Sequence, residues 1–281
     1  MWKEKRTTGF FNNLQNARNG HTLQWNGKLP MGKKNGEKRL IGPEDESKTF
    51  GEGLNFAASE AYRLLRTNVL FALPYAALPE GQTCRIIGIT SSLSGEGKST
   101  TALNLSYMLA ESGRRVLLVE ADMRLPTISR RLGLSFETGL SNLLAGLCKE
   151  KDVIQPSGIS ENLRVMGAGA TPPNPSEMLG SDGLKTVLNS LSPSYDFMIL
   201  DLPPVTEVTD ALVASRLVHG MILVVRRDYA TRSSLGEAMR QLEHVNAKVL
   251  GFVMTHADSP EKRYKSYGYG YGKKGKAAGG D

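Results

Sequence analysis

Residues 91–100, SSLSGEGKST, combine glycine, lysine and hydroxyl side chains in the pattern of a phosphate-binding loop. The two glycines permit backbone angles closed to other residues, so successive N–H groups can converge on an anion. The lysine can reach the β- and γ-phosphates of a nucleotide, and the hydroxyl of Ser99 is suited to Mg²⁺. The predicted ATP-binding residues are Ser94, Gly95, Glu96, Gly97, Lys98, Ser99 and Thr100.

The loop has Ser92 where the usual motif, GxxxxGK[ST], has glycine, so the neighbouring residues must support the prediction. Residues 85–90, RIIGIT, are typical of a short buried strand. From Ala102 to Leu109 apolar residues recur at helical spacing, and a helix beginning near Ser99 points its positive end at the same anion. Strand, glycine-rich turn and helix is the order that a phosphate site requires. The alternative is a surface loop with a chance lysine.

Acidic residues follow two further apolar runs. Glu120 comes after the run 116–119 and Asp122 two positions later, so both carboxylates can face a bound nucleotide. Asp201 directly follows the run 197–200, a pattern that brings a carboxylate to Mg²⁺ in phosphate-loop enzymes. Phosphoryl transfer needs oxygen ligands for Mg²⁺ and a group that orients or deprotonates the attacking hydroxyl, and these acids can supply both. The predicted catalytic residues are Lys98, Glu120, Asp122 and Asp201.

Simpler roles compete with these assignments. Two acids at the end of a strand are often a solvated turn, and any strand can end in aspartate. Asp210, in the sequence VTDA, is expected to cap the helix that follows it.

Strand-like and helix-like segments alternate from residue 85 onward, which predicts an α/β fold with a mostly parallel sheet flanked by helices. Ligands in such folds bind beyond the carboxyl ends of the strands, where the loop and the acids lie. The expected strands are 85–90, 115–119, 163–166, 196–200, 220–225 and 248–254. The expected helices are 57–72, 99–112, 137–146, 176–191, 209–217 and 232–243.

The chain has 281 residues, enough for one large domain with a sizeable core. No apolar run approaches the roughly 18 residues that cross a bilayer, and residues 1–13 lack the apolar core of a signal peptide. The two cysteines, Cys84 and Cys148, have neither metal-ligand nor redox spacing, which favours a reducing cytoplasm.

Positive charge is concentrated at the two ends of the chain. Residues 1–50 carry +5 and residues 261–281 carry +4 of the total charge of +7, which leaves −2 for residues 51–260. The expected organisation is a flexible basic segment 1–50, a phosphate-loop domain 51–260 and a flexible tail 261–281. Nucleic-acid binding would need a basic face on the folded domain, so no nucleic-acid partner is expected.

The tail contains four of the nine tyrosines, in the sequence RYKSYGYGYGKKGK. Glycine alternates with tyrosine, so the segment has no face that could be buried. Flexible phenols can enter an active site of the same or a neighbouring chain and be phosphorylated there. Each phosphorylation adds about −1.5 to −2 charges to the basic tail. A nucleic-acid stacking surface and a low-complexity tail are the alternatives. The predicted phosphoacceptors are Tyr264, Tyr267, Tyr269 and Tyr271.

Together, the phosphate loop, the acidic motif after the next strand, the strand-ending aspartate and the tyrosine cluster resemble the bacterial tyrosine kinases, which are cytoplasmic kinases of capsule and exopolysaccharide synthesis. The resemblance covers about residues 57–271 and includes the Pro-Asn-Pro sequence within 167–177. It implies a phosphate-loop NTPase fold of the MinD/ParA kind and ATP-dependent autophosphorylation of the tail between subunits. It also assigns the charged stripe of Glu60, Arg63 and Arg66 to the packing of subunits into a ring.

The resemblance also implies roles for single residues. Lys98 would bind phosphate, and Glu120 stands where the family has an aspartate that acts as the base toward tyrosine. A carboxylate misplaced by about 1 Å can cost on the order of 100-fold in rate, so this departure bears on catalysis. Ser94 replaces a usual proline, and Thr255-His256 stands where an asparagine often helps to read adenine. The implied ligands of Mg²⁺ are Ser99, Asp122 and Asp201.

The implied partners are other copies of the chain, the cytoplasmic tail of a membrane-anchored activator (a polysaccharide co-polymerase) and a cognate tyrosine phosphatase. The expected location is the cytoplasm, at the inner face of the membrane through the activator. Two other functions compete with the kinase. One is an ATPase switch of the MinD/ParA kind. Proteins of that kind carry an additional lysine near the position of Leu93 or Ser94, and its absence from this chain argues against this function. The other is a nucleotide-binding scaffold with weak transfer activity that regulates a polysaccharide polymerase.

Overall fold

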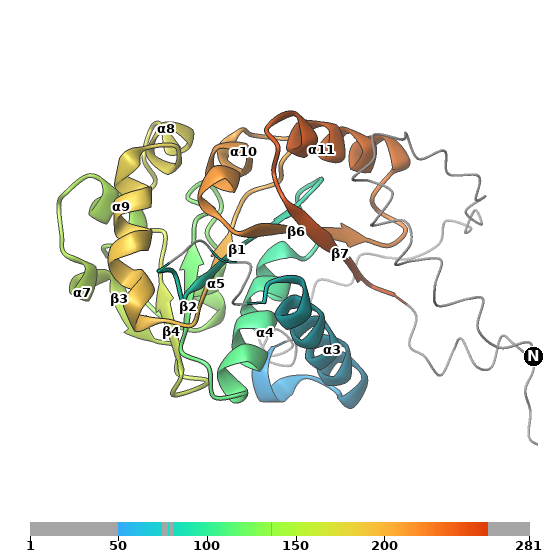
Figure 1. The fold of residues 1–281 in the computed structure, drawn as a ribbon, viewed down its shortest axis with the longest axis horizontal. Helices are drawn as coiled ribbons and strands as arrows, with labels where there is room; N and C mark the ends of the chain where they lie inside the picture. The colour runs from blue at the N-terminus through green and yellow to red at the C-terminus, as the bar shows by residue number, and fades with distance from the viewer. Residues whose placement is uncertain (1–49, 75–77, 79–80, 136, 258–281) are drawn as a thin grey trace, which may run out of the picture. The chain divides into compact units, whose positions relative to one another are not determined.

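The computed structural model describes residues 50–74, 78, 81–135 and 137–257. In these ranges the chain forms a seven-stranded sheet in the order β3-β4-β2-β5-β1-β6-β7 (Figure 1). Every neighbouring pair is parallel except β3 and β4, so the predicted mostly parallel α/β fold is confirmed. The strands are β1 (Arg85–Ser91), β2 (Val116–Glu120), β3 (Ile154–Pro156), β4 (Leu163–Met166), β5 (Phe197–Asp201), β6 (Gly220–Arg226) and β7 (Val249–Thr255).

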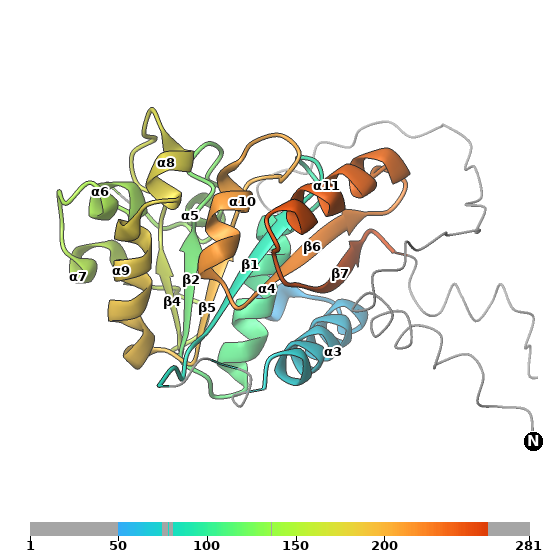
Figure 2. The ribbon, with the colours of Figure 1, turned by 45° about the horizontal axis from the view of Figure 1, so that its top comes forward.

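The helices form a layer on each face of the sheet (Figure 2). The α-helices are α3 (Phe56–Ala72), α4 (Lys98–Glu111), α5 (Ile128–Arg131), α6 (Leu140–Leu144), α7 (Glu150–Val153), α8 (Pro175–Leu179), α9 (Asp182–Leu191), α10 (Asp210–Ala214) and α11 (Arg232–His244). The 3₁₀ turns are η3 (Gly51–Gly53), η5 (Ser192–Ser194) and η6 (Ser215–Leu217). No helix in the described ranges is long and apolar enough to span a bilayer.

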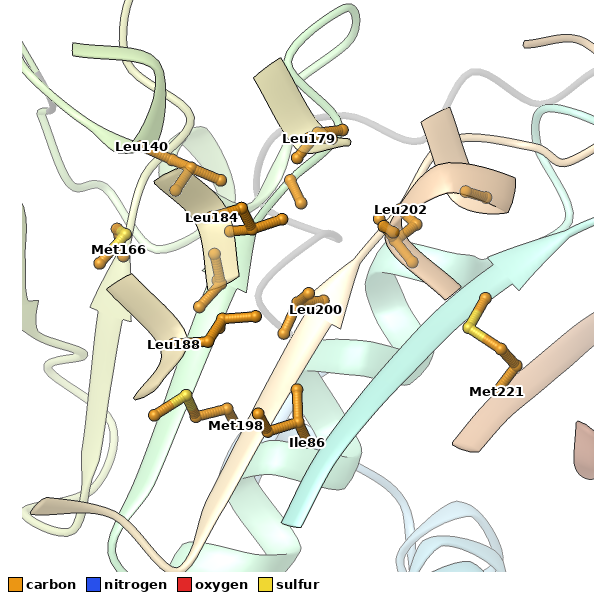
Figure 3. Close-up of a cluster of buried hydrophobic side chains, with 14 of the residues drawn as sticks. Ile86, Leu140, Met166, Leu179, Leu184, Leu188, Met198, Leu200, Leu202 and Met221 are labelled. Atoms are coloured by element: carbon orange, nitrogen blue, oxygen red, sulfur yellow. The ribbon is translucent and has the colours of Figure 1, made fainter. Parts of the chain in front are cut away.

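Two hydrophobic clusters bury the two faces of the sheet. Helices α3 and α4 pack on one cluster, and α9, α10 and α11 pack on the other. In the second cluster Leu184 and Leu188 of α9 lie over Met198 and Leu200 of β5 (Figure 3). Because helices cover both faces, the central strands are nearly continuous apolar runs and not alternating ones.

Each of the six predicted strands forms, with ends within one residue of the expected ones. The expected helix 176–191 divides at Gly180 into α8 and α9, and the expected helix 209–217 ends as the 3₁₀ turn η6. Strand β3 and helices α5 and α7 lack a sequence prediction, because three or four residues are too few to show a hydrophobic period.

Parts of the predicted organisation lie outside the described residues. These are nearly all of the segment 1–50 and the whole tail 261–281, with its four tyrosines. The boundaries of the segment and of the tail therefore stay predictions.

Candidate active site

The carboxyl ends of β1, β2 and β5 meet at one edge of the sheet, and the loop 92–97 leads from β1 into α4 there. Gly95 and Gly97 have φ angles of 81° and 96°, in the left-handed region that favours glycine. A Cβ atom at Gly97 would lie 3.2 Å from the methyl carbon of Thr255. The Thr255 hydroxyl donates a hydrogen bond of 2.8 Å to the carbonyl oxygen of Glu96, so β7 supports the loop. The loop therefore has the turn that an anion site requires.

The buried Glu96 side chain holds this loop in place. Its carboxylate accepts hydrogen bonds from the Ser92 hydroxyl (2.8 Å) and the Leu93 N–H (2.7 Å). Its other oxygen accepts one from the Arg226 N–H (3.4 Å). Ser92, which stands where glycine is usual, thus supplies a donor that glycine lacks. Because the Glu96 carboxylate binds these groups, the predicted contact of Glu96 with ATP can come only from its backbone.

Lys98 is buried at the start of α4 and is paired with an acid of the site. Its ammonium group lies 2.7 Å from Asp122 Oδ2, and the side chains are 10% and 3% exposed. The Leu125 N–H donates to the other Asp122 oxygen (3.0 Å). Burial lowers the pKa of Lys98, but the negative charges of Asp201, Asp122 and Glu120 outweigh burial and raise it. Lys98 is therefore positively charged in its pairing with Asp122.

Asp201 ends β5 and is 1% exposed. Within the described residues neither of its carboxylate oxygens has a hydrogen-bond partner of ordinary geometry. Burial raises the pKa of Asp201 to about 6, against the opposing effects of the Lys98 charge and the Ser99 hydroxyl. A buried carboxylate without a partner is costly, and a bound cation would remove that cost. This site therefore fits Mg²⁺.

Glu120 lies beside Asp201, since the two are paired in the register of β2 and β5. Its carboxylate is fully buried and turned toward α5. One oxygen accepts a hydrogen bond from the Ile128 N–H and the other accepts one from the Ser129 hydroxyl. The predicted base is thus held by a short helix that sequence periodicity does not reveal.

Helix α5 also contacts the first turn of α4, which follows the phosphate loop. The guanidinium of Arg131 donates to the hydroxyl of Thr100, one of the predicted ATP-binding residues. Ser129 and Arg131 therefore contact predicted site residues, and nothing in the sequence indicates either contact.

Asp210 corrects a sequence prediction. Thr209 is the N-cap residue of α10, and Asp210 is its first helical residue. The Asp210 carboxylate is buried and accepts two hydrogen bonds from the Arg124 guanidinium, each 3.0 Å long. The Ser176 hydroxyl of α8 donates to it as well. Two hydrogen bonds from one guanidinium are stronger than a single capping bond, so the Asp210 carboxylate pairs with Arg124 and does not cap the helix. Through Arg124, Asp210 anchors the turn that follows Asp122.

The stripe of Glu60, Arg63 and Arg66 lies on α3, away from these acids. Arg63 pairs with Glu60 one helical turn earlier, and both side chains are about half exposed. Arg66 donates a hydrogen bond of 3.1 Å to the Met108 carbonyl near the end of α4. Arg66 therefore stabilises the packing of α3 on α4, and Arg63 lies at the surface.

Comparisons with known proteins agree with this geometry. Residues 84–249 match a family model described as an AAA domain. The chain is 36% identical over 214 residues to the putative tyrosine-protein kinase CapB of Staphylococcus aureus, covering 76% of this chain and 90% of that protein. The chain belongs to the bacterial tyrosine kinases. Its structure resembles the kinase domain of the Escherichia coli tyrosine kinase ETK (TM-score 0.63, 33% identity, 76% of this chain and 80% of the other).

This bacterial tyrosine kinase also resembles the septum site-determining protein MinD of Pyrococcus horikoshii, solved as a complex with Mg-ADP. The TM-score is 0.52 at 28% identity, over 65% of this chain and 76% of the other. The predicted family and the phosphate-loop fold of the MinD kind are thereby confirmed. The roles assigned to single residues stay predictions.

Proposed function

We propose that this bacterial tyrosine kinase transfers the γ-phosphoryl group of ATP to the tyrosines of its tail, mainly between subunits, and so regulates the synthesis and export of capsular polysaccharide or exopolysaccharide. The observation that carries the proposal is the convergence of Lys98 with three buried acids at one edge of the sheet. Asp201 among them is buried, and in the described ranges neither of its oxygens has a hydrogen-bond partner of ordinary geometry, as expected of a carboxylate that binds a cation.

Asp122, Asp201 and the Ser99 hydroxyl would hold Mg²⁺ as oxygen ligands. Within the described residues no cluster of three or more His, Cys, Asp or Glu side chains forms a metal site of its own, so nucleotide phosphates and water would complete the shell. Bound Mg²⁺ would neutralise charge on the β- and γ-phosphates. Lys98 would exchange Asp122 for a phosphate oxygen.

In the transfer, the phenol oxygen of a tail tyrosine forms a bond to the γ-phosphorus. The bond from that phosphorus to the oxygen bridging to the β-phosphate breaks, and ADP leaves. Glu120 would accept the phenol proton. Its hydrogen bonds from Ile128 and Ser129 fix its direction and leave further acceptor sites on both oxygens.

Assembly into a ring is supported by a hollow of about 450 Å³ beside the charged stripe. Arg63, Arg66, Glu52 and Glu111 are among its lining residues, so both signs of charge face one opening. Such a surface suits the charged residues of a second copy. The cytoplasmic tail of a membrane-anchored activator would recruit the ring to the inner face of the membrane, and a cognate tyrosine phosphatase would reverse the modification.

The test is mass spectrometry of the tail peptide from cells that produce the full chain. Phosphotyrosine is expected within residues 264–271. Lys98→Met is expected to abolish it, because the charge that binds the transferred phosphate is lost. Labelling that persists in Lys98→Met would contradict the assigned site.

ATP hydrolysis and nucleotide binding, measured on the purified chain beside the phosphotyrosine assay, separate the alternatives. Likeness to MinD keeps an ATPase switch in view, although the additional loop lysine is absent at Leu93 and Ser94. Steady ATP turnover without phosphotyrosine would identify that switch. Nucleotide binding with neither turnover nor phosphotyrosine would identify a regulatory scaffold.

A further inference from the structure

The segment 202–207, which follows β5, runs beside the end of β1 and the start of the phosphate loop. The Leu202 N–H donates to the Ile89 carbonyl (2.9 Å), and the Val205 N–H donates to the Ser91 carbonyl (2.9 Å). The Thr90 hydroxyl donates to the Pro203 carbonyl (2.7 Å). One further bond joins the Thr206 hydroxyl to the Ser92 carbonyl. These bonds fix the place at which the next residue, Glu207, meets the loop.

Glu207 meets the loop at one of its backbone amides. Its Oε1 accepts a hydrogen bond of 2.7 Å from the Ser94 N–H, and both residues are exposed at the mouth of the site. Ser94 directly precedes Gly95, whose left-handed backbone is of the kind that lets successive amides converge on an anion. A carboxylate and a phosphate are both anionic oxygen acceptors, so they compete for the same N–H group.

We infer that the Glu207 carboxylate occupies the Ser94 amide in place of a ligand phosphate and lowers the affinity of the loop for nucleotide. A phosphate arriving at the loop must displace the carboxylate from this amide. It must then bind with a negative charge a few ångströms away, which is unfavourable near a protein surface. The inference rests on the proposed function in one respect, namely that the loop binds nucleotide phosphate.

The test compares Glu207→Gln with the unmodified chain in calorimetric titrations with MgATP. Glutamine removes the charge and keeps an oxygen acceptor, and Glu207→Ala removes both. We expect Glu207→Gln to lower the Kd for MgATP by about three- to fivefold at low salt, from one removed charge repulsion. The gain should shrink to below about twofold at high salt, because ions screen exposed charges.

Glu161→Gln is the matched control. It removes the same charge at an exposed residue that precedes β4, at the opposite edge of the parallel sheet, and the Kd should not change. Unchanged or weaker MgATP binding in Glu207→Gln overturns the inference and would assign Glu207 to support of the loop. Tighter binding in Glu207→Gln without any phosphotyrosine in the tail would leave the inference standing and remove the kinase reaction.

Discussion

Asp201 is a buried acid, and its environment sets a pH dependence of stability. Burial raises its pKa from the ordinary 3.8 to about 6. The folded protein therefore binds a proton at Asp201 more readily than the unfolded chain does. The stabilisation from that proton is fully present below about pH 4 and is lost as the pH rises through about 6.

Asp201→Asn should remove this loss. The free energy of unfolding of the variant, relative to the unmodified chain, should increase between pH 4 and pH 7 by up to about 3 kcal/mol, since two pKa units correspond to about that energy. Urea unfolding at several pH values in the absence of Mg²⁺ measures the difference. Glu161→Gln, at an exposed position before β4, is the control for loss of one carboxylate, and the change for Asp201→Asn should exceed the change for this control. A change for Asp201→Asn no larger than that of the control would show that Asp201 is not held in a desolvated state.

Helix α5 has only four residues, yet it orients the proposed base. The Ser129 hydroxyl and the Ile128 N–H both bind the Glu120 carboxylate, so the longer side chain of glutamate is held at two points. The glutamate side chain, one methylene longer than the aspartate that the family resemblance implies at this position, thus has a local support for its length.

Removal of the base and removal of its support should differ in size. Glu120→Gln should lower kcat for autophosphorylation by about 100-fold or more, as general base catalysis contributes on that order. Ser129→Ala should lower kcat by about tenfold with little change in the KM for ATP, and Ser129→Thr should restore most of the rate because it restores the hydroxyl. Initial rates of phosphotyrosine formation measure both. Equal rates in Glu120→Gln and the unmodified chain would exclude Glu120 as the base.

The larger elements could be predicted from the sequence, and the contacts between them could not. Long apolar runs and helical spacing place the six longer strands and α4, because burial on both faces imposes those patterns. The order of the loop and the acids also places Lys98, Asp122 and Asp201 at one edge. The partner of Asp210 is Arg124, 86 positions away, and no local pattern links the two. Likewise, nothing in the sequence GEGK indicates that the Glu96 side chain faces the interior.

At the scale of the whole molecule, the charged stripe on α3 can be tested for assembly separately from folding. Arg63→Ala should lower the stability of the chain by less than about 1 kcal/mol, since its ion pair with Glu60 is exposed. In a ring built through this stripe, Arg63→Ala should still shift the sedimentation coefficient toward the monomer. Arg66→Ala should lower both the assembly and the melting temperature, because it also loses the bond to Met108. Unchanged sedimentation of Arg63→Ala would argue against the stripe as an interface.

The contact between Thr255 and Glu96 has a consequence for the tail. Tyr264 follows Thr255 by nine residues, and a segment of that length spans about 30 Å at most. Because Thr255 contacts the phosphate loop, this segment begins beside the candidate site of its own chain. Short tethers give effective concentrations in the millimolar range. The proposed transfer between subunits therefore has to compete with the chain's own tyrosines, and an ordered assembly that presents a neighbour's tail would favour it.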